Sequence, residues 1–262
     1  ETDDPELQFI IGKSFMEGKD DYPVDKIKGS IYLEESINAG NIESVIYYSK
    51  ILIEGIIIPK DLNKAQNILD KYLDRNDSII LNLYAHILEE KTYYTSSFEY
   101  YERSSNLGNI DSTYKAGIML IEGVGTVTNK KRGLFLLKTA ADKGHLGAMN
   151  DYANMLRTGD GIPQNLQESS RYFKMAADGG EVNAMNNYGL MLSSGMGVPM
   201  NKSEGSRYLK MAADKGHLGA MNDYAIMLRT GDGIPQNLQE SSRYFKMAAD
   251  GGEVNAMNNY GL

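Results

Sequence analysis

The sequence contains no cysteine and no tryptophan, and only 6 prolines and 3 histidines among its 262 residues. Without cysteine the chain can form no disulfide framework, thiolate zinc site or iron–sulfur cluster, and it has no cysteine nucleophile. No apolar run approaches the ~18 residues that a membrane-spanning helix needs. The first residues show no charged-then-apolar leader. These absences favour a cytoplasmic location as an expectation, although a secreted protein can also lack cysteine.

Acidic residues outnumber basic ones and give a net charge of −8, so the basic face that nucleic-acid phosphates need is missing. The excess lies in residues 1–107, which carry 11 basic and 20 acidic side chains, whereas residues 108–262 carry 16 and 15. A solvated acidic surface is the favoured interpretation. The alternative is an acidic surface that meets a basic partner.

Internal repetition dominates the chain. Residues 140–190 and 212–262 are identical at an offset of 72, except that Asn154 is replaced by Ile226. A half-period of 36 also holds, and weaker copies lie upstream of residue 140. A fixed period of this length indicates stacked repeats. Without any linker between the units, we expect a single domain over 1–262, with divergent acidic repeats in 1–107 and regular ones in 108–262.

Each repeat is predicted to form two antiparallel helices. Apolar residues recur at helical spacing across 148–156, and the Gly-Asp-Gly turn at 159–161 is expected to end that helix, because glycine accepts the positive φ of a helix C-cap. Asn165 is expected to cap the second helix together with Glu168. In the unit 75–107 the middle loop is shorter. The sequence therefore predicts an all-α fold with no strand.

The repeated pattern small-x-x-x-apolar-Gly/Ala-x-x-apolar-x-x-Gly-x-Gly-Val/Ile-Pro-x-Asn, closed by Lys-Met-Ala-Ala-Asp-x-Gly, resembles the Sel1-like repeat (SLR), a relative of the tetratricopeptide repeat (TPR). The resemblance is strong from Gly108 onward and looser in 1–107. It implies a right-handed α-solenoid of about seven 36-residue repeats plus one extra C-terminal helix. It also implies an adaptor scaffold for protein complexes, and it disfavours the branch with a disulfide in each repeat.

No pattern in the sequence points to catalysis, a cofactor or a metal. The Gly-Asp-Gly turns at 159–161 and 231–233 lack the phosphate-loop pattern and the alternating carboxylates of a calcium loop, which favours a plain interhelix turn. His86 and Glu89 share one helix face, but two ligands are too few for a metal site. An enzyme in its own right is disfavoured, since nothing assembles a nucleophile, a base and an oxyanion site.

Two kinds of residue recur with the repeat and are interpreted as structural. His145 and His217 occupy the same position just before a helix. The repeated methionines are interpreted as core filling, because methionine packs irregular gaps. They are Met149, Met155, Met175, Met185, Met191 and Met211.

By the resemblance, the first helix of each pair lines the concave face of the array. The predicted partner-binding residues on this face are Asn82, Asn150, Asn154, Arg157, Asn186, Asn222, Arg229 and Asn258. An amide both donates to and accepts from a peptide backbone, so an asparagine column suits an extended ligand. The arginines would add charge-assisted bonds to ligand carboxylates. The alternative is a solvated wall that was copied with the repeat.

These features predict a non-catalytic adaptor or scaffold that binds a protein or peptide along the concave face, with no nucleic-acid partner and no membrane span. The alternative is a regulatory repeat region cut from a larger enzyme such as a protein kinase. Residues 252–262 supply only the first helix of a further unit, so Tyr260 and Leu262 are expected to leave apolar surface uncovered. Self-association through this open C-terminal end is a further expectation.

Overall fold

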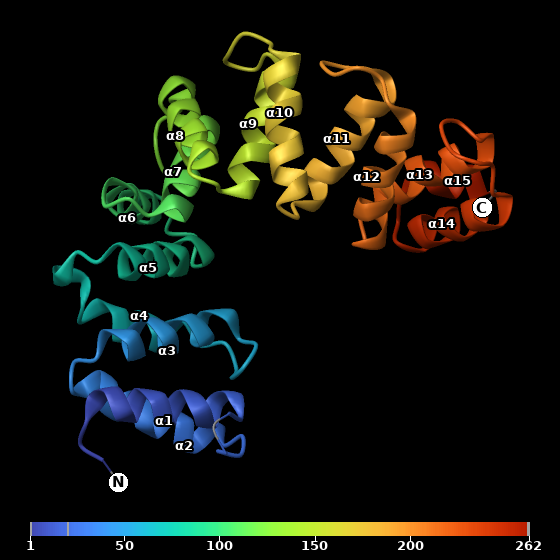
Figure 1. Ribbon diagram of the computed structural model, residues 1–262. Coiled ribbons are helices and arrows are strands. Elements are labelled where there is room, and N and C mark those ends of the chain that lie inside the picture. Colours follow the sequence, from blue (N-terminus) through green and yellow to red (C-terminus); the bar gives the residue numbers. More distant parts are fainter. Residues whose placement is uncertain (1, 20, 261–262) are drawn as a thin grey trace. The chain divides into compact units, whose positions relative to one another are not determined.

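The structure, a computed structural model, describes residues 2–19 and 21–260. Within these ranges the chain forms 15 α-helices, one short 3-10 helix and no strand, which confirms the predicted all-α fold. The chain divides into two compact units, Glu1–Asn129 and Lys130–Leu262. Figure 1 shows consecutive helix pairs in each unit. The boundary falls inside the repeat predicted at 108–142, and the single domain expected from the sequence stays a prediction.

The first unit consists of three helix pairs and one further helix. Its helices are α1 (Pro5–Glu17), α2 (Lys26–Asn38), α3 (Ile42–Glu54), α4 (Leu62–Asp70), the 3-10 helix Leu73–Arg75, α5 (Ser78–Glu90), α6 (Tyr94–Asn106) and α7 (Ile110–Glu122). The pairs α1–α2, α3–α4 and α5–α6 pack within themselves, and α6 also packs on α7. Between α5 and α6 the loop is a short turn, as the sequence predicts.

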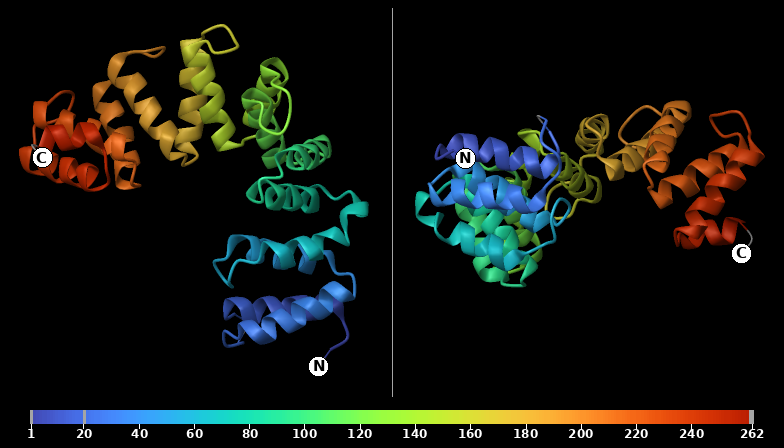
Figure 2. Two further views of the ribbon diagram at one scale, coloured as in Figure 1. Left: turned by 180° about the vertical axis from the view of Figure 1, so that it is seen from behind. Right: turned by 90° about the horizontal axis from the view of Figure 1, so that it is seen from below.

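The second unit repeats one arrangement with little variation. Its helices are α8 (Lys130–Asp142), α9 (Leu146–Thr158), α10 (Leu166–Asp178), α11 (Val182–Ser194), α12 (Lys202–Asp214), α13 (Leu218–Thr230), α14 (Leu238–Asp250) and α15 (Val254–Tyr260). From α10 onward, each second helix contacts its own first helix and also the next first helix, as α10 does with α9 and α11. Both views of Figure 2 show this sequence of neighbouring pairs.

The helix ends follow the predicted capping. Gly159 ends α9 in the left-handed region, with φ of 77°. The Asn165 side chain accepts from the Glu168 N–H at 3.0 Å and donates to the Glu168 carboxylate at 3.2 Å. The glutamate does not reach the backbone N–H of Asn165, because that N–H donates to the Leu156 carbonyl at 2.8 Å. The cap is therefore confirmed, in a variant of the expected capping box.

The second glycine of each loop lies against the preceding helix pair. A Cβ at Gly197 would stand 2.2 Å from the Leu166 carbonyl oxygen, and one at Gly125 would stand 2.2 Å from the Tyr94 carbonyl oxygen. Both glycines have φ near +70°. Only glycine fits this close approach, so the loop glycine sets how tightly one repeat stacks on the previous one.

Alanine and methionine fill the core between helices. Ala153 and Ala176 are fully buried, as expected where helices approach closely. Met185 and Met191 are buried as predicted, but Met175 is 44% exposed, so the core-filling interpretation is wrong for Met175. Among the described helices, none is long and apolar enough to cross a membrane.

Candidate partner-binding face

The predicted site residues lie on the first helices of the pairs. Asn82 is on α5 in the first unit, and the others lie on α9, α11, α13 and α15 in the second unit. We call the side formed by α9, α11, α13 and α15 the first-helix face of the second unit. Asn150 and Asn222 are only 7% and 6% exposed, and the remaining predicted residues of this face are half-buried or exposed.

Asn150 and Asn222 join successive first helices. The Asn187 Nδ2 on α11 donates to the Asn150 Oδ1 on α9 at 3.2 Å, and the Asn259 Nδ2 on α15 donates to the Asn222 Oδ1 on α13 at 3.0 Å. The Asn150 Nδ2 donates in turn to Asp151. These amides stabilise the stacking of the repeats. Their predicted contact with a partner stays a prediction.

Asn186 occupies the same repeat position on α11, but its side-chain oxygen receives no hydrogen bond from the described residues of the next first helix. The residue 37 positions later is Asp223 on α13, which has no N–H to donate from its ionised side chain. Within the described residues the Asn186 Oδ1 is buried without a hydrogen-bond partner. Burial raises the pKa of Asp223 above its ordinary value. Of the three junctions between successive first helices that the structure describes, the one between α11 and α13 is therefore the one that lacks the amide hydrogen bond.

Asn154 and Arg157 form a pair on α9. The Arg157 Nη2 donates to the Asn154 Oδ1 at 3.1 Å. In the second copy Ile226 replaces the asparagine, and the equivalent Arg229 adopts other contacts. Its Cζ lies 4.9 Å from the centre of the Phe245 ring, and its Nη2 donates to the Asn259 Oδ1 at 3.4 Å.

A hollow of about 220 Å³ lies between α9 and α11 on the first-helix face. Its lining residues are Arg157, Asn187, Leu190, Met191, Ser194 and Met196. Leu190 and Met196 are each 41% exposed. The hollow therefore combines one guanidinium group with accessible apolar side chains.

The two remaining predicted residues lie in different surroundings. The Asn82 Oδ1 accepts from the Ser112 Oγ at 2.7 Å and so joins α5 to α7 in the first unit. Asn258 is exposed on α15. Helix α15 confirms the predicted extra first helix, but Leu262 and the side chain of Tyr260 lie outside the described residues, so their predicted exposure stays a prediction.

The second helices carry a series of bonds that the sequence reasoning missed. The hydroxyls of Tyr172, Tyr208 and Tyr244 donate to the carboxylates of Asp142, Asp178 and Asp214, each 30 residues earlier, at 2.5–2.6 Å. A lysine one turn before each aspartate forms an ion pair with it, as Lys174 does with Asp178 at 2.6 Å. The signal was present in the recurrence of Tyr and Asp, but only the stacking of pairs shows which ones meet.

The electrostatics of this Tyr–Asp series are similar at each repeat. Burial opposes the ionisation of Asp178, but hydrogen bonds from Lys174 and Tyr208 outweigh it and hold its pKa below the ordinary value. Burial and the bond to Asp178 raise the pKa of Tyr208. The charged groups of the second helices are thus largely engaged within the molecule.

The turns and histidines that were considered as candidate ligand or catalytic sites form bonds that stabilise the fold. In the Gly-Asp-Gly turns, Asp160 pairs with Lys130 at 2.9 Å and Asp232 pairs with Lys202 at 2.8 Å. These pairs confirm an interhelix turn. The His145 Nδ1 accepts from the Ala148 N–H at 2.9 Å, so this histidine caps α9 as a structural residue.

Glu89 is the centre of a polar junction in the first unit. Its carboxylate lies 3.9 Å from the His86 Nδ1 and accepts from the Tyr101 hydroxyl at 2.7 Å and from the Lys115 Nζ at 3.0 Å. The nearby His86 and the hydrogen bonds from Tyr101 and Lys115 lower the pKa of Glu89 to about 2. Across the described residues, no group of three or more histidine, aspartate or glutamate side chains is placed to hold a metal ion.

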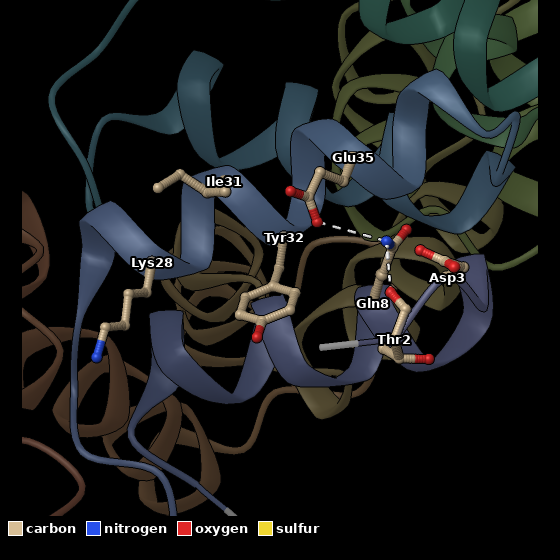
Figure 3. A pocket seen from close by; sticks show the side chains of 7 residues that line it. All are labelled: Thr2, Asp3, Gln8, Lys28, Ile31, Tyr32 and Glu35. Atoms are coloured by element: carbon tan, nitrogen blue, oxygen red, sulfur yellow. Dashed lines mark hydrogen bonds between the residues drawn. The ribbon is translucent and has the colours of Figure 1, made fainter.

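Another hollow, of about 610 Å³, lies on the pair α1–α2 (Figure 3). Its lining residues are Thr2, Asp3, Gln8, Lys28, Ile31, Tyr32 and Glu35. The Gln8 Nε2 donates to the Thr2 carbonyl at 2.8 Å and to the Glu35 carboxylate at 3.4 Å, as the dashed lines show. Tyr32 stands at the repeat position of Tyr172. In the second unit the equivalent Tyr172 bonds to Asp142 on the preceding second helix.

The stacked pairs and the bonds repeated between them define a helical-repeat protein. The family model described as the Sel1 repeat matches residues 94–109, 110–145, 147–181, 182–217 and 219–253. These segments cover more than half of the sequence, and the chain belongs to the Sel1 repeat family. No curated protein sequence matches the chain.

Solved structures share the fold at low sequence identity. A protective antigen of uropathogenic Escherichia coli strains with an SLR fold is 15% identical, with a TM-score of 0.85 over 98% of this chain and 56% of that protein. A Sel1 repeat protein from Oxalobacter formigenes is 20% identical, with a TM-score of 0.81 over 98% of this chain and 75% of that one. Yeast Tom70 is 14% identical, with a TM-score of 0.58 over 98% of this chain and 54% of that chain. The chain thus spans little more than half the length of two of these proteins.

Proposed function

We propose that the chain is a non-catalytic scaffold that binds a protein or extended peptide along the first-helix face of the second unit. Sel1 and TPR-like repeats are generally used for protein–protein interaction. The observation that supports this face in particular is the contrast between the two sides of the repeats. On the second helices the Lys and Asp side chains of the Tyr–Asp series are engaged within the molecule, whereas the first-helix face offers amide, guanidinium and apolar groups side by side.

The chemistry of the first-helix face suits a peptide. Half-buried Asn154 offers an amide group that can pair with a peptide backbone. Leu190 and Met196 offer exposed apolar contact next to Arg157. An interface core that mixes apolar side chains with a few hydrogen-bonding groups is typical of protein–protein recognition.

Two carboxylates with lowered pKa values show structural rather than catalytic surroundings. Glu89 and Asp178 have shifted pKa values because they receive hydrogen bonds that join neighbouring helices. Neither carboxylate lines the hollow between α9 and α11. Their shifted pKa values are explained by structure, so they need no reaction to account for them.

The test compares two exposed apolar residues on opposite sides. Peptides selected from a displayed library of random 12-residue sequences are measured against the wild type, Leu190→Glu on the first-helix face and Met175→Glu on a second helix. The two side chains are 41% and 44% exposed, which makes the pair well matched. We expect L190E to weaken binding at least about tenfold, or 1.4 kcal/mol, and M175E to leave it unchanged.

The opposite result would place the ligand elsewhere. Loss of binding in M175E alone would put the ligand on the second helices. Failure to select any peptide above a scrambled-sequence background would reject peptide binding altogether. Circular dichroism melting of both variants checks that neither substitution unfolds the repeats.

A further inference from the structure

The two nearly identical copies differ at one side chain, so the contacts around that position can be compared. Residues 140–190 and 212–262 differ only at Asn154 and Ile226. Both residues lie on a first helix, one turn before an arginine. Differences in the contacts of Arg157 and Arg229 therefore arise from this substitution and from the different segments that flank the two copies.

In the first copy the asparagine holds the arginine over a hollow. The single bond from the Arg157 Nη2 to the Asn154 Oδ1 uses one of the five N–H donors of the guanidinium. No carboxylate forms an ion pair with Arg157 in the part of the chain that the structure describes. The group lies at the edge of the hollow between α9 and α11, which contains no acidic side chain.

In the second copy the arginine contacts the second helix of its own pair and also the next first helix, where its Nη2 donates to the Asn259 Oδ1 at 3.4 Å. Isoleucine has no acceptor, and the Arg229 guanidinium lies over the Phe245 ring, 4.9 Å from its centre. This cation–π contact covers a phenylalanine that is itself buried. The equivalent of Phe245 in the first copy is Phe173, which is fully buried. An arginine freed from Asn154 therefore has an aromatic ring at the matching position to turn towards.

The lining of the hollow determines what it accepts. A guanidinium binds a carboxylate through two parallel hydrogen bonds, and Lys cannot copy that geometry. Leu190, Met191 and Met196 line the rest of the hollow and favour an apolar side chain. At roughly 30 Å³ per water, its 220 Å³ corresponds to about seven waters, which is room for one side chain with its adjoining carboxylate.

We propose that Asn154 is a specificity-determining residue that positions Arg157, and that the hollow between α9 and α11 binds a carboxylate next to an apolar side chain. This proposal rests on the proposed function and adds the class of ligand, an acidic peptide segment with an aliphatic or aromatic residue beside its carboxylate. Asn154 acts through Arg157. In the second copy Ile226 stands in place of Asn154 and offers Arg229 no acceptor.

The direct test is an NMR titration of the full chain with N-acetyl-leucine, which carries both groups. N-acetyl-leucinamide lacks the carboxylate, and N-acetylglycine lacks the side chain. We expect N-acetyl-leucine to shift the Nε–Hε signal of Arg157 and the methyl signal of Met196, and to bind about tenfold more tightly than either control. We expect Asn154→Ile to weaken this binding about tenfold and to shift the Arg157 methylene signals upfield, as the side chain moves over the Phe173 ring.

The substitution is suited to the fold, because isoleucine already occupies this position in the second copy. Reciprocal Ile226→Asn should move Arg229 off Phe245, with a downfield shift of its methylene signals. Equal binding of N-acetyl-leucinamide and N-acetyl-leucine would overturn the proposal. Unchanged binding of N-acetyl-leucine by N154I, or no shift of Arg157 at any concentration of this probe, would overturn it as well.

The library peptides separate this subsite from the broader proposal. If selected peptides depend on Leu190 but bind N154I as well as the wild type, the first-helix face remains the binding face and the subsite is wrong. If L190E leaves the same peptides unaffected, the proposed function itself is wrong. Enrichment of an acidic residue beside an apolar one among the selected peptides supports both.

Discussion

Replacing Asp223 with asparagine should stabilise the protein at neutral pH. Asn186 and Asp223 stand at the two positions that Asn150 and Asn187 occupy one repeat earlier, where an amide donates across the junction at 3.2 Å. In Asp223→Asn the new Nδ2 can donate to the buried Asn186 Oδ1, which has no partner within the described residues. Its Oδ1 can still accept from Asn222, as the aspartate does now at 3.2 Å.

The expected gain has two contributions. A new hydrogen bond to a buried acceptor contributes about 0.5–1.5 kcal/mol. Removal of a partly buried negative charge adds to this, because burial raises the pKa of Asp223 and so makes its ionisation costly in the folded state. Together we expect about 1–2 kcal/mol at pH 7, which corresponds to a rise in melting temperature of roughly 2–8 °C.

The dependence on pH gives the gain a distinctive signature. Since the folded-state pKa is raised above the ordinary 3.8, the cost of ionisation is fully present above the folded-state pKa, shrinks as the pH falls from that value towards 3.8, and is absent below 3.8. At about pH 3 the protonated carboxyl can itself donate to Asn186, so the advantage of D223N should largely vanish. Melting curves at pH 7 and pH 3 measure both.

The reverse substitution is the matched control. Asn187→Asp removes the donor to the Asn150 Oδ1 and should destabilise the protein at pH 7 by about 1–2 kcal/mol. A D223N protein no more stable than the wild type at pH 7, together with a harmless N187D, would refute the role assigned to these junction amides.

Two further substitutions test other junctions. Glu89→Gln should lower the free energy of unfolding by about 1–2 kcal/mol at pH 7, after allowance for partial exposure, because the carboxylate receives bonds from Tyr101 and Lys115. Urea titrations should show this cost shrink as the pH falls from about 4.5 towards 2, since the folded-state pKa is depressed to about 2. A cost that is independent of pH would contradict this explanation. Gly197→Ala should destabilise the protein by about 1–3 kcal/mol more than Gly216→Ala. Both glycines have positive φ, but only a Cβ at Gly197 meets the Leu166 carbonyl oxygen, at 2.2 Å. Equal melting temperatures of the two variants would show that the loop can move away from this contact.

Local features of the repeat were predictable from sequence because their causes are local. A helix cap depends on residues three positions apart, so Asn165 could be identified without knowledge of the fold. His145 could be assigned a structural role from its recurrence, although the acceptor role of its Nδ1 emerged only from the folded geometry. The interhelix turn at 159–161 followed from the conformational freedom of glycine.

Contacts between repeats could not be predicted in the same way. Tyr172 meets Asp142 across 30 residues, and this pairing depends on how second helices stack. The burial of Asn150 runs against the expectation that a polar column faces solvent, because the next first helix supplies Asn187 as a partner. The different contacts of Arg157 and Arg229 accompany the change from Asn154 to Ile226 and the different segments that flank the two copies, and the pattern of residue types does not reveal them.

The repeated bonds have a consequence for how the gene can change length. Every Tyr–Asp bond of the second unit joins a residue to one 30 positions away, and each copy carries the same donors and acceptors. Removal of the 72 residues 158–229 would join α9 to the loop after α13 and place Tyr244 at the position of Tyr172, opposite Asp142. The acceptor and donor that meet there are the same as before. Unequal recombination between the two copies can therefore shorten or lengthen the array by two helix pairs at a time, and the number of helix pairs can change without any new contact between them.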